Sequence, residues 1–188
     1  TRPTEGWQGV SGGPVIGQAL LAASRPASEN RRAHSLHGYF LRAGDTGMPI
    51  LYKVDRIRDG KSFTTRRVVA VQRGQAIFTM SISFQVAEDG LSHQFDMPDI
   101  PDPETVPTED EIRQEQAKSW PLEFQDSVSS GLAIQLRPLD PVDLFKPKPA
   151  EANQRCWMRC GDRLPDDPRI HQCVLAYLSD WSLLDTSA

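Results

Sequence analysis

Short turns between strand-like stretches are the feature that most constrains the fold of this sequence. Within residues 77–85, Phe78, Met80, Ile82 and Phe84 alternate with polar side chains, a period of two that predicts a strand buried on one face. Turn signals at Arg73-Gly74 and Asp59-Gly60 separate this stretch from earlier ones. The expected strands are residues 34–41, 51–58, 63–72 and 77–85. Because connections this short force neighbouring strands to be antiparallel, the sequence predicts an antiparallel meander.

A helix is predicted ahead of the meander. Gly12-Gly13-Pro14 opens a helical stretch that runs from Val15 to Ser24, and proline is tolerated at a helix start because its missing N–H has no partner there. The apolar stripe expected on this helix comprises Ile16, Ala19, Leu20 and Ala23. Gly17 and the alanines keep the helix thin enough for a curved sheet to wrap around it. The order of helix and meander predicts an α+β fold, not a doubly wound one.

The middle of the chain differs in composition. Residues 88–119 hold four prolines and a formal charge of −8, with little apolar periodicity. Thr108 followed by Glu111 fits a capping box, so a short helix is expected over 108–118. We assign residues 1–87 to a first domain and residues 88–130 to an acidic, proline-rich linker.

Residues 131–188 are expected to begin a second domain. Strands are predicted over 132–136 and 155–160, followed by a helix from Arg169 to Leu184. The apolar stripe expected on that helix comprises Ile170, Val174, Tyr177, Leu178 and Trp181. A helix with so wide an apolar face needs a sheet to cover it, and one or two strands are too few. We therefore expect a fragment of a longer polypeptide, the alternative being that another chain covers the helix.

Charge and hydropathy restrict the classes of function. The net charge is −4, the sequence pI is about 5.6, and no aromatic and basic recognition motif is present, so nucleic acid is not an expected partner. Residues 1–87 carry a charge of +7, which is either a solvated surface or an attraction for an anionic ligand. No apolar run approaches the roughly 20 residues that span a bilayer, and no signal-peptide pattern opens the chain. We expect a cytoplasmic protein without membrane insertion.

Three cysteines near the end of the chain, together with His171, raise the question of a metal site. If residues 156–160 form a strand, the α-carbons of Cys156 and Cys160 lie about 13 Å apart, at about 3.3 Å per residue. Thiolates that far apart share neither a zinc ion nor a disulfide. We therefore expect no metal site, and the odd number of cysteines, which includes Cys173, suits a reducing compartment.

Two patterns suggest hydrolytic chemistry only weakly. Ser11, in Gly9-Val10-Ser11-Gly12-Gly13, matches the G-x-S-x-G elbow of serine hydrolases, but that elbow needs a parallel sheet and the sequence predicts an antiparallel one. His34 and His37 lie three residues apart, so on a regular strand they face opposite sides and cannot act as a pair. Each is more simply a hydrogen-bonded sheet histidine than a general base.

Asp180 is the most interesting carboxylate. On the expected second helix it falls about 100° from the middle of the apolar stripe, near Cys173, Tyr177 and Leu184. A carboxylate at the edge of a buried face is partly desolvated, which makes it a better general base. The alternative is an ordinary solvated aspartate near a helix end.

An ordered series of motifs runs over nearly the whole chain. In the first block the motifs are Gly12-Gly13, residues 15–20, residues 34–45, residues 58–63, Arg66-Arg67-Val68 and Ser83-Phe84-Gln85. In the third block they are Leu164-Pro165-Asp166-Asp167, His171-Gln172 and the run to Ser179-Asp180. This series resembles the acyl-CoA thioesterase II (TesB-like) family. The chain departs from the family at Ser11-Gly12-Gly13-Pro14, where Phe-Gly-Gly-Gln is usual.

The resemblance implies a double hotdog fold, two fused domains in which an antiparallel sheet wraps a helix, with the second hotdog incomplete in this chain. It implies hydrolysis of fatty acyl-CoA to a fatty acid and coenzyme A by water that an Asp, a Thr or Ser, and a Gln activate together. Asp180 matches the Asp, whereas the other two lie beyond Ala188 in the family pattern.

The resemblance implies acyl-CoA as the substrate and no cofactor. We also expect a homo-oligomer. Two alternatives stay open, a hotdog module that binds acyl-CoA without hydrolysing it and a serine hydrolase that uses Ser11.

Overall fold

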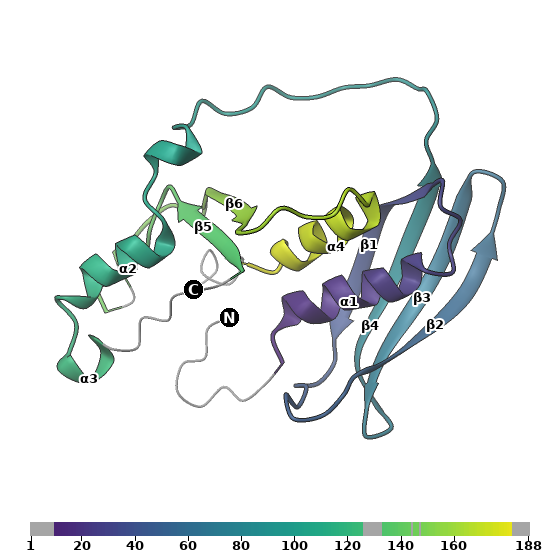
Figure 1. Ribbon diagram of the computed structural model, residues 1–188, viewed down its shortest axis with the longest axis horizontal. Helices are drawn as coiled ribbons and strands as arrows, with labels where there is room; N and C mark the ends of the chain where they lie inside the picture. The colour runs from purple at the N-terminus through teal and green to yellow at the C-terminus, as the bar shows by residue number, and fades with distance from the viewer. Residues whose placement is uncertain (1–9, 126–132, 144, 147, 182–188) are drawn as a thin grey trace. The chain divides into compact units, whose positions relative to one another are not determined.

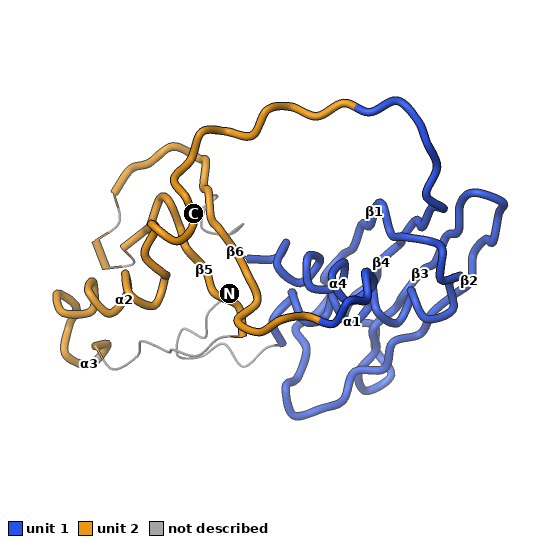
Figure 2. Tube along the Cα trace, turned by 45° about the horizontal axis from the view of Figure 1, so that its top comes forward, with its two compact units in different colours: residues 1–92, 165–184 blue, residues 93–164, 185–188 orange. Residues whose placement is uncertain are grey.

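A computed structural model of the chain describes residues 10–125, 133–143, 145, 146 and 148–181. The chain divides into two compact units (Figure 2). The first unit comprises residues 1–92 and 165–184, and the second comprises residues 93–164 and 185–188. The helix near the end of the chain therefore packs with the first unit, although more than 70 residues separate it in sequence from the meander.

The first unit is built on an antiparallel sheet with the strand order β1-β4-β3-β2. The strands are β1 (Arg31–Phe40), β2 (Leu51–Asp59), β3 (Phe63–Gln72) and β4 (Gln75–Val86). The turn between β3 and β4 has a positive φ at both Arg73 (47°) and Gly74 (76°), as a two-residue hairpin requires. The predicted antiparallel meander is confirmed for β2, β3 and β4, whereas β1 pairs with β4 and not with β2, its neighbour in sequence. β1 also begins three residues earlier than the sequence indicated.

Helix α1 (Gly12–Ser24) crosses one face of this sheet (Figure 1), which we call the inner face. Its buried side chains meet the alternate, buried residues of β3 and β4. The core they form includes Val15, Ala19, Leu20 and Ala23 of α1, Val68 and Ala70 of β3, and Phe78, Met80, Ile82 and Phe84 of β4. The period of two in β4 is therefore the pattern of a strand with one buried face, as predicted.

Arg66 is a charged residue inside this core, with 1% of its surface exposed. Its guanidinium donates to the carbonyl oxygens of Arg58 and Pro26 at 3.1 Å and to Oδ1 of Asp59 at 2.6 Å. Pro26 follows the end of α1, where helix carbonyls lack partners and a cation is favourable. Arg66 thus joins the end of α1 to the end of β2.

Helix α4 (Pro168–Leu178) is antiparallel to α1, because Gly13 lies against Tyr177 and Gly17 lies against Cys173. Asp167 caps its first turn by accepting from the amide of Arg169. The sequence predicted a helix as far as Leu184, but α4 ends at Leu178, and Ser179 and Asp180 form a turn. Leu184 lies outside the described residues. The buried side chains of α4 are Cys173 and Ala176, and the predicted stripe is only partly buried.

A β-bulge between Ala33 and Ser35 corrects the prediction for the two histidines. Nε2 of His34 lies 2.8 Å from Oγ of Ser83, and His37 pairs in register with Ser81. Both serines belong to the outward-facing set of β4, so both histidines lie on the outer face of the sheet. One extra residue at a bulge reverses the alternation, which a regular strand pattern cannot anticipate.

The second unit contains a two-stranded antiparallel sheet of β5 (Ile134–Pro138) and β6 (Cys156–Cys160). It also contains the 3-10 helix η1 (Pro103–Thr105) and the helices α2 (Glu109–Ala117) and α3 (Leu122–Gln125). The capping box of Thr108 and Glu111 at α2 is confirmed. η1 and α3 lie within the segment that the sequence indicated as a linker, and their few residues gave no periodic signal.

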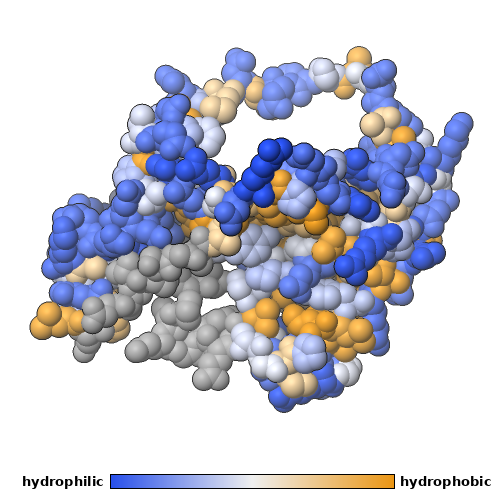
Figure 3. All heavy atoms as spheres, viewed as in Figure 1, coloured by the Kyte–Doolittle hydropathy of each residue, from blue (hydrophilic) through white to orange (hydrophobic). Residues whose placement is uncertain are grey.

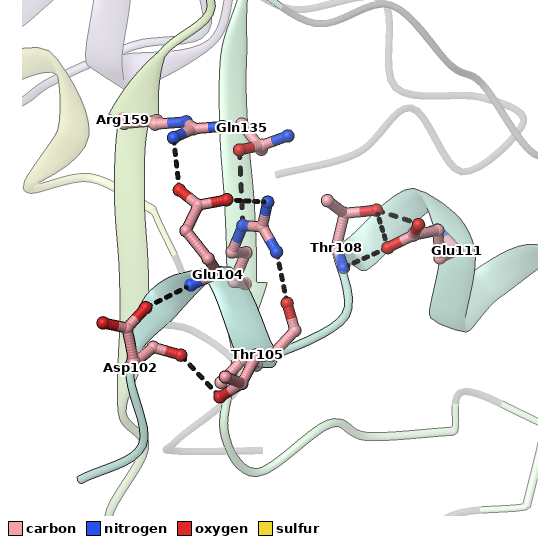
Figure 4. A network of polar contacts seen from close by, with 9 residues as sticks. Asp102, Glu104, Thr105, Thr108, Glu111, Gln135 and Arg159 are labelled. Atoms are coloured by element: carbon pink, nitrogen blue, oxygen red, sulfur yellow. Dashed lines mark hydrogen bonds and ion pairs between the residues drawn. The ribbon is translucent and has the colours of Figure 1, made fainter.

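A polar network joins η1 to the sheet of the second unit (Figure 4). Glu104 accepts from Nη1 of Arg159 at 2.6 Å and from Nη2 of Arg137 at 3.3 Å. Arg137 also donates to the carbonyl oxygen of Val106. One carboxylate thus forms ion pairs with guanidinium groups from two neighbouring strands, which is a structural role.

The segment between β4 and η1 contains no helix or strand. Figure 3 shows hydrophobic residues scattered along it among polar ones, and Leu91, Phe95 and Met97 are largely exposed. Within the described ranges, no helix combines the length and the apolar content that crossing a bilayer requires.

Candidate active site

The first turn of α1 forms one side of the candidate site. Ser11 is the N-cap residue, with extended backbone angles (φ −60°, ψ 145°) and no capping hydrogen bond from its side chain. The amides of the first turn have no carbonyl partner within the helix, and they carry the partial positive charge of the helix N-terminus. A negatively charged group is therefore stabilised in front of Gly12 and Gly13.

Asp180 supplies a carboxylate at this place. A Cβ atom added to Gly12 would lie 2.7 Å from Oδ2 and 2.9 Å from Oδ1 of Asp180. The carboxylate therefore lies against the backbone at the first residue of α1, and only glycine leaves room for it. The side chain of Asp180 is partly buried, so it keeps contact with water while losing part of its hydration.

The packing of α1 on α4 sets this approach. A Cβ atom at Gly13 would lie 2.8 Å from the carbonyl oxygen of Tyr177, and one at Gly17 would lie 3.0 Å from that of Cys173. Two glycines four residues apart face α4 on one side of α1. Because these glycines have no side chains, the two helix backbones approach each other closely. This close approach places Asp180 next to the start of α1.

Gln172, in the N-terminal half of α4, holds this helix on strand β1 of the sheet. Its side-chain amide donates to the carbonyl oxygen of Ala33 at 2.6 Å and accepts from the amide of Ala33 at 3.2 Å. This paired contact satisfies the backbone of β1 at its bulge. The sequence named Gln172 only as part of a motif, and no local pattern indicated its partner.

Phe40 forms the apolar side of the site. A Cβ atom at Gly12 would lie 2.6 Å from Cζ of Phe40, as close as it would lie to Asp180. The ring also packs on Phe78, with centroids 4.9 Å apart. Phe40, the start of α1 and Asp180 thus converge on Gly12. Phe40 lies in the 34–45 motif, but the sequence assigns it no role, because one aromatic residue at a strand end carries no chemical signal.

The other candidates from the sequence do not join this cluster. His34 and His37 lie on the outer face of the sheet, whereas Phe40 lies with the inner set of β1. Ser11 adjoins the site, but the sheet of its unit is antiparallel throughout, which is not the setting of a nucleophile elbow.

The cysteines are set apart by burial and position. Burial raises the pKa of the Cys173 thiol to about 11, so this thiol stays protonated and unreactive at neutral pH. Cys156 and Cys160 lie at opposite ends of β6, in register with Pro138 and Ile134. Among the residues described by the structure, no three His, Cys, Asp or Glu side chains form a group that would hold a metal ion.

Comparison with known proteins identifies the family. Residues 3–85 match the family model for the acyl-CoA thioesterase N-terminal domain, and residues 134–188 match that for acyl-CoA thioesterase. Acyl-coenzyme A thioesterase 8 of Homo sapiens is 38% identical over 184 residues, which are 94% of this chain and 58% of the human protein. The chain belongs to the acyl-CoA thioesterase II family.

Two further proteins support the assignment of the chain to the acyl-CoA thioesterase II family. Acyl-CoA thioesterase 2 of Haemophilus influenzae is 35% identical over 97% of this chain and 64% of its own length. The crystal structure of the acyl-CoA thioesterase II TesB2 of Mycobacterium marinum is 43% identical, with a TM-score of 0.73 over 95% of this chain and 62% of that chain. The chain thus spans about three fifths of the length of these family members.

A more distant structure bears on the fold alone. A protein with a hotdog fold from Alicyclobacillus acidocaldarius is 22% identical, with a TM-score of 0.64, and this chain covers 58% of it. The α+β hotdog fold that the resemblance implied is confirmed. The described residues form one four-stranded sheet and one two-stranded sheet.

Proposed function

We propose that the protein containing this chain hydrolyses fatty acyl-CoA thioesters, with Asp180 as the general base. The observation that carries the proposal is the contact of the Asp180 carboxylate with the first residue of α1. A partly buried carboxylate lies there beside the start of α1, whose first amides have no partner within the helix. Thioester hydrolysis needs these two kinds of group, one for the water and one for the carbonyl oxygen.

The proposed reaction is general-base hydrolysis. Asp180 takes a proton from a water molecule whose oxygen attacks the carbonyl carbon of the thioester. Negative charge then develops on the carbonyl oxygen, and amides at the start of α1 stabilise it. The C–S bond breaks, and coenzyme A leaves as a thiolate, which is a good leaving group because thiols ionise at about pH 8.5. The fatty acid is the second product, and no cofactor takes part.

Two further features belong to the proposal. The family pattern adds a Thr or Ser and a Gln that orient the water, and both lie past the last residue of this sequence. We also propose residues 1–87 as the first hotdog domain, 88–130 as the linker and 131–188 as the start of the second hotdog. A homo-oligomer and a cytoplasmic location remain expectations from the sequence.

A comparison of thioesters with oxygen esters tests the proposed activity. Full-length protein is assayed for release of free coenzyme A from several acyl-CoAs and for hydrolysis of simple oxygen esters. We expect turnover of acyl-CoA, and Ser11→Ala should keep it within about threefold, whereas loss of a true nucleophile costs several orders of magnitude.

Other outcomes of this assay would reject the proposal. Turnover of oxygen esters alone, lost in Ser11→Ala with the fold intact, would establish the serine hydrolase. Binding of acyl-CoA without release of coenzyme A would establish the module that binds but does not hydrolyse.

A further inference from the structure

Phe40 is unusually exposed for a residue of the inner face. It alternates with Tyr39 and belongs to the set of β1 that includes Gly38 and Leu36, which oppose the buried residues Met80 and Ile82 of β4. Yet 53% of Phe40 and 39% of Leu36 are exposed, whereas Phe78 beside them is 2% exposed. Among the residues that the structure describes, an apolar surface on the core side of β1 is therefore left open.

Gly38 connects these two side chains into one surface. A Cβ atom at Gly38 would lie 2.7 Å from Cζ of Phe78, so the ring of Phe78 fills the place that a side chain would take. Leu36 and Phe40, with Gly38 and the buried ring of Phe78 between them, thus form an apolar strip along the inner side of β1. We call it the β1 track. Four residues of strand give it a length of about 13 Å.

The β1 track begins at the candidate active site. Cζ of Phe40 and the carboxylate of Asp180 approach the same point at Gly12. A substrate whose carbonyl group reaches Asp180 therefore places the neighbouring atoms on the ring of Phe40. In an acyl thioester those atoms are either methylene groups of the acyl chain or the polar arm of coenzyme A. An apolar surface favours the methylene groups.

We propose that the β1 track binds the acyl chain, with Phe40 under the carbons next to the carbonyl group and Leu36 under the distal carbons. Phe40 and Leu36 are then residues that set the acyl-length preference. This inference rests on the proposed function, because it takes the position of the carbonyl group from Asp180. It predicts an order of effects: short chains touch neither residue, medium chains touch Phe40, and long chains touch both.

Binding measurements test this order without relying on turnover. Full-length protein with Asp180→Asn is titrated calorimetrically with acetyl-CoA, octanoyl-CoA and lauroyl-CoA. Adding Phe40→Ala should weaken binding of octanoyl-CoA and lauroyl-CoA about tenfold, or about 1.4 kcal/mol, because methylene groups of the acyl chain lose their apolar contact. Adding Leu36→Ala should weaken binding of lauroyl-CoA alone. Acetyl-CoA should change less than about threefold in both.

Matched variants separate the track from general damage. Tyr39→Ala removes an adjacent ring that is 61% exposed on the opposite face of β1, and it should leave all three affinities unchanged. Phe40→Leu keeps an apolar side chain and should restore most of the octanoyl-CoA affinity. If Phe40→Ala lowers the midpoint of thermal unfolding strongly, Phe40→Leu and Leu36→Ala still give the order of effects.

The possible failures are distinguishable. Equal weakening for all three esters, or no weakening for any, would overturn the track, whatever the wild-type activity. A wild-type protein that releases no coenzyme A would overturn the proposed function, while a length-dependent loss of affinity in the same protein would still support the track.

Discussion

At the scale of single residues, burial decides which charged groups matter for stability. Arg66 is almost fully buried, and its partner Asp59 is 59% exposed on its side chain. The hydrogen bond from Arg66 holds the pKa of the Asp59 carboxyl below its usual value of 3.8, with further help from the charge of Arg66. Asp59 is thus stabilised as a carboxylate in the folded state more than in the unfolded state.

The Asp59→Asn substitution tests this linkage through pH. A carboxyl group with a lowered pKa contributes stability above its unfolded pKa, and the contribution is lost as the pH falls through the folded pKa. At about pH 6, Asp59→Asn should therefore lower the unfolding midpoint relative to the wild type. At about pH 3 the difference should shrink. A difference that is constant over this range would show that the ion pair with Arg66 contributes nothing.

At the scale of elements, the contact of α1 with α4 depends on glycine. In an exposed helix, Gly→Ala stabilises by about 0.5–1 kcal/mol. At Gly13 we predict the opposite sign, because the new Cβ would lie 2.8 Å from the carbonyl oxygen of Tyr177 and force the helices apart. Gly13→Ala should destabilise by about 1–3 kcal/mol in urea unfolding, the usual cost of overpacking. Gly90→Ala has open space around its Cβ and is the control.

Local sequence patterns predict some features of these elements and miss others. The alternation in β4, the turns of the meander and the capping box of α2 all depend on neighbouring residues, and all three were predicted. The bulge at His34, where Gln172 bonds the backbone of Ala33, and the end of α4 at Leu178 carry no local sequence signal, and both were missed. Asp180 was singled out from its sequence position, but its approach to Gly12 and Phe40 follows only from the packing of three elements.

At the scale of the whole molecule, the structure joins distant parts of the chain at one point. The start of α1, the end of β1 and the turn after α4 meet at Gly12, and Gln172 and Arg66 fix the other ends of these elements. The sequence stretches that carry the family resemblance are largely those that build this meeting point. Asp180 is the proposed base because its carboxylate lies at this meeting point.

The substitution Asp180→Asn in full-length protein tests the central claim most directly. The amide is nearly isosteric with the carboxylate but cannot take a proton from water. We predict that kcat for release of coenzyme A falls about 10² to 10⁴-fold, the usual range for loss of a general base, with KM and the unfolding midpoint little changed. Asp162→Asn, at an exposed position after β6, is the control and should leave kcat unchanged. Equal kcat values for the two variants would contradict the assignment of Asp180 as the base.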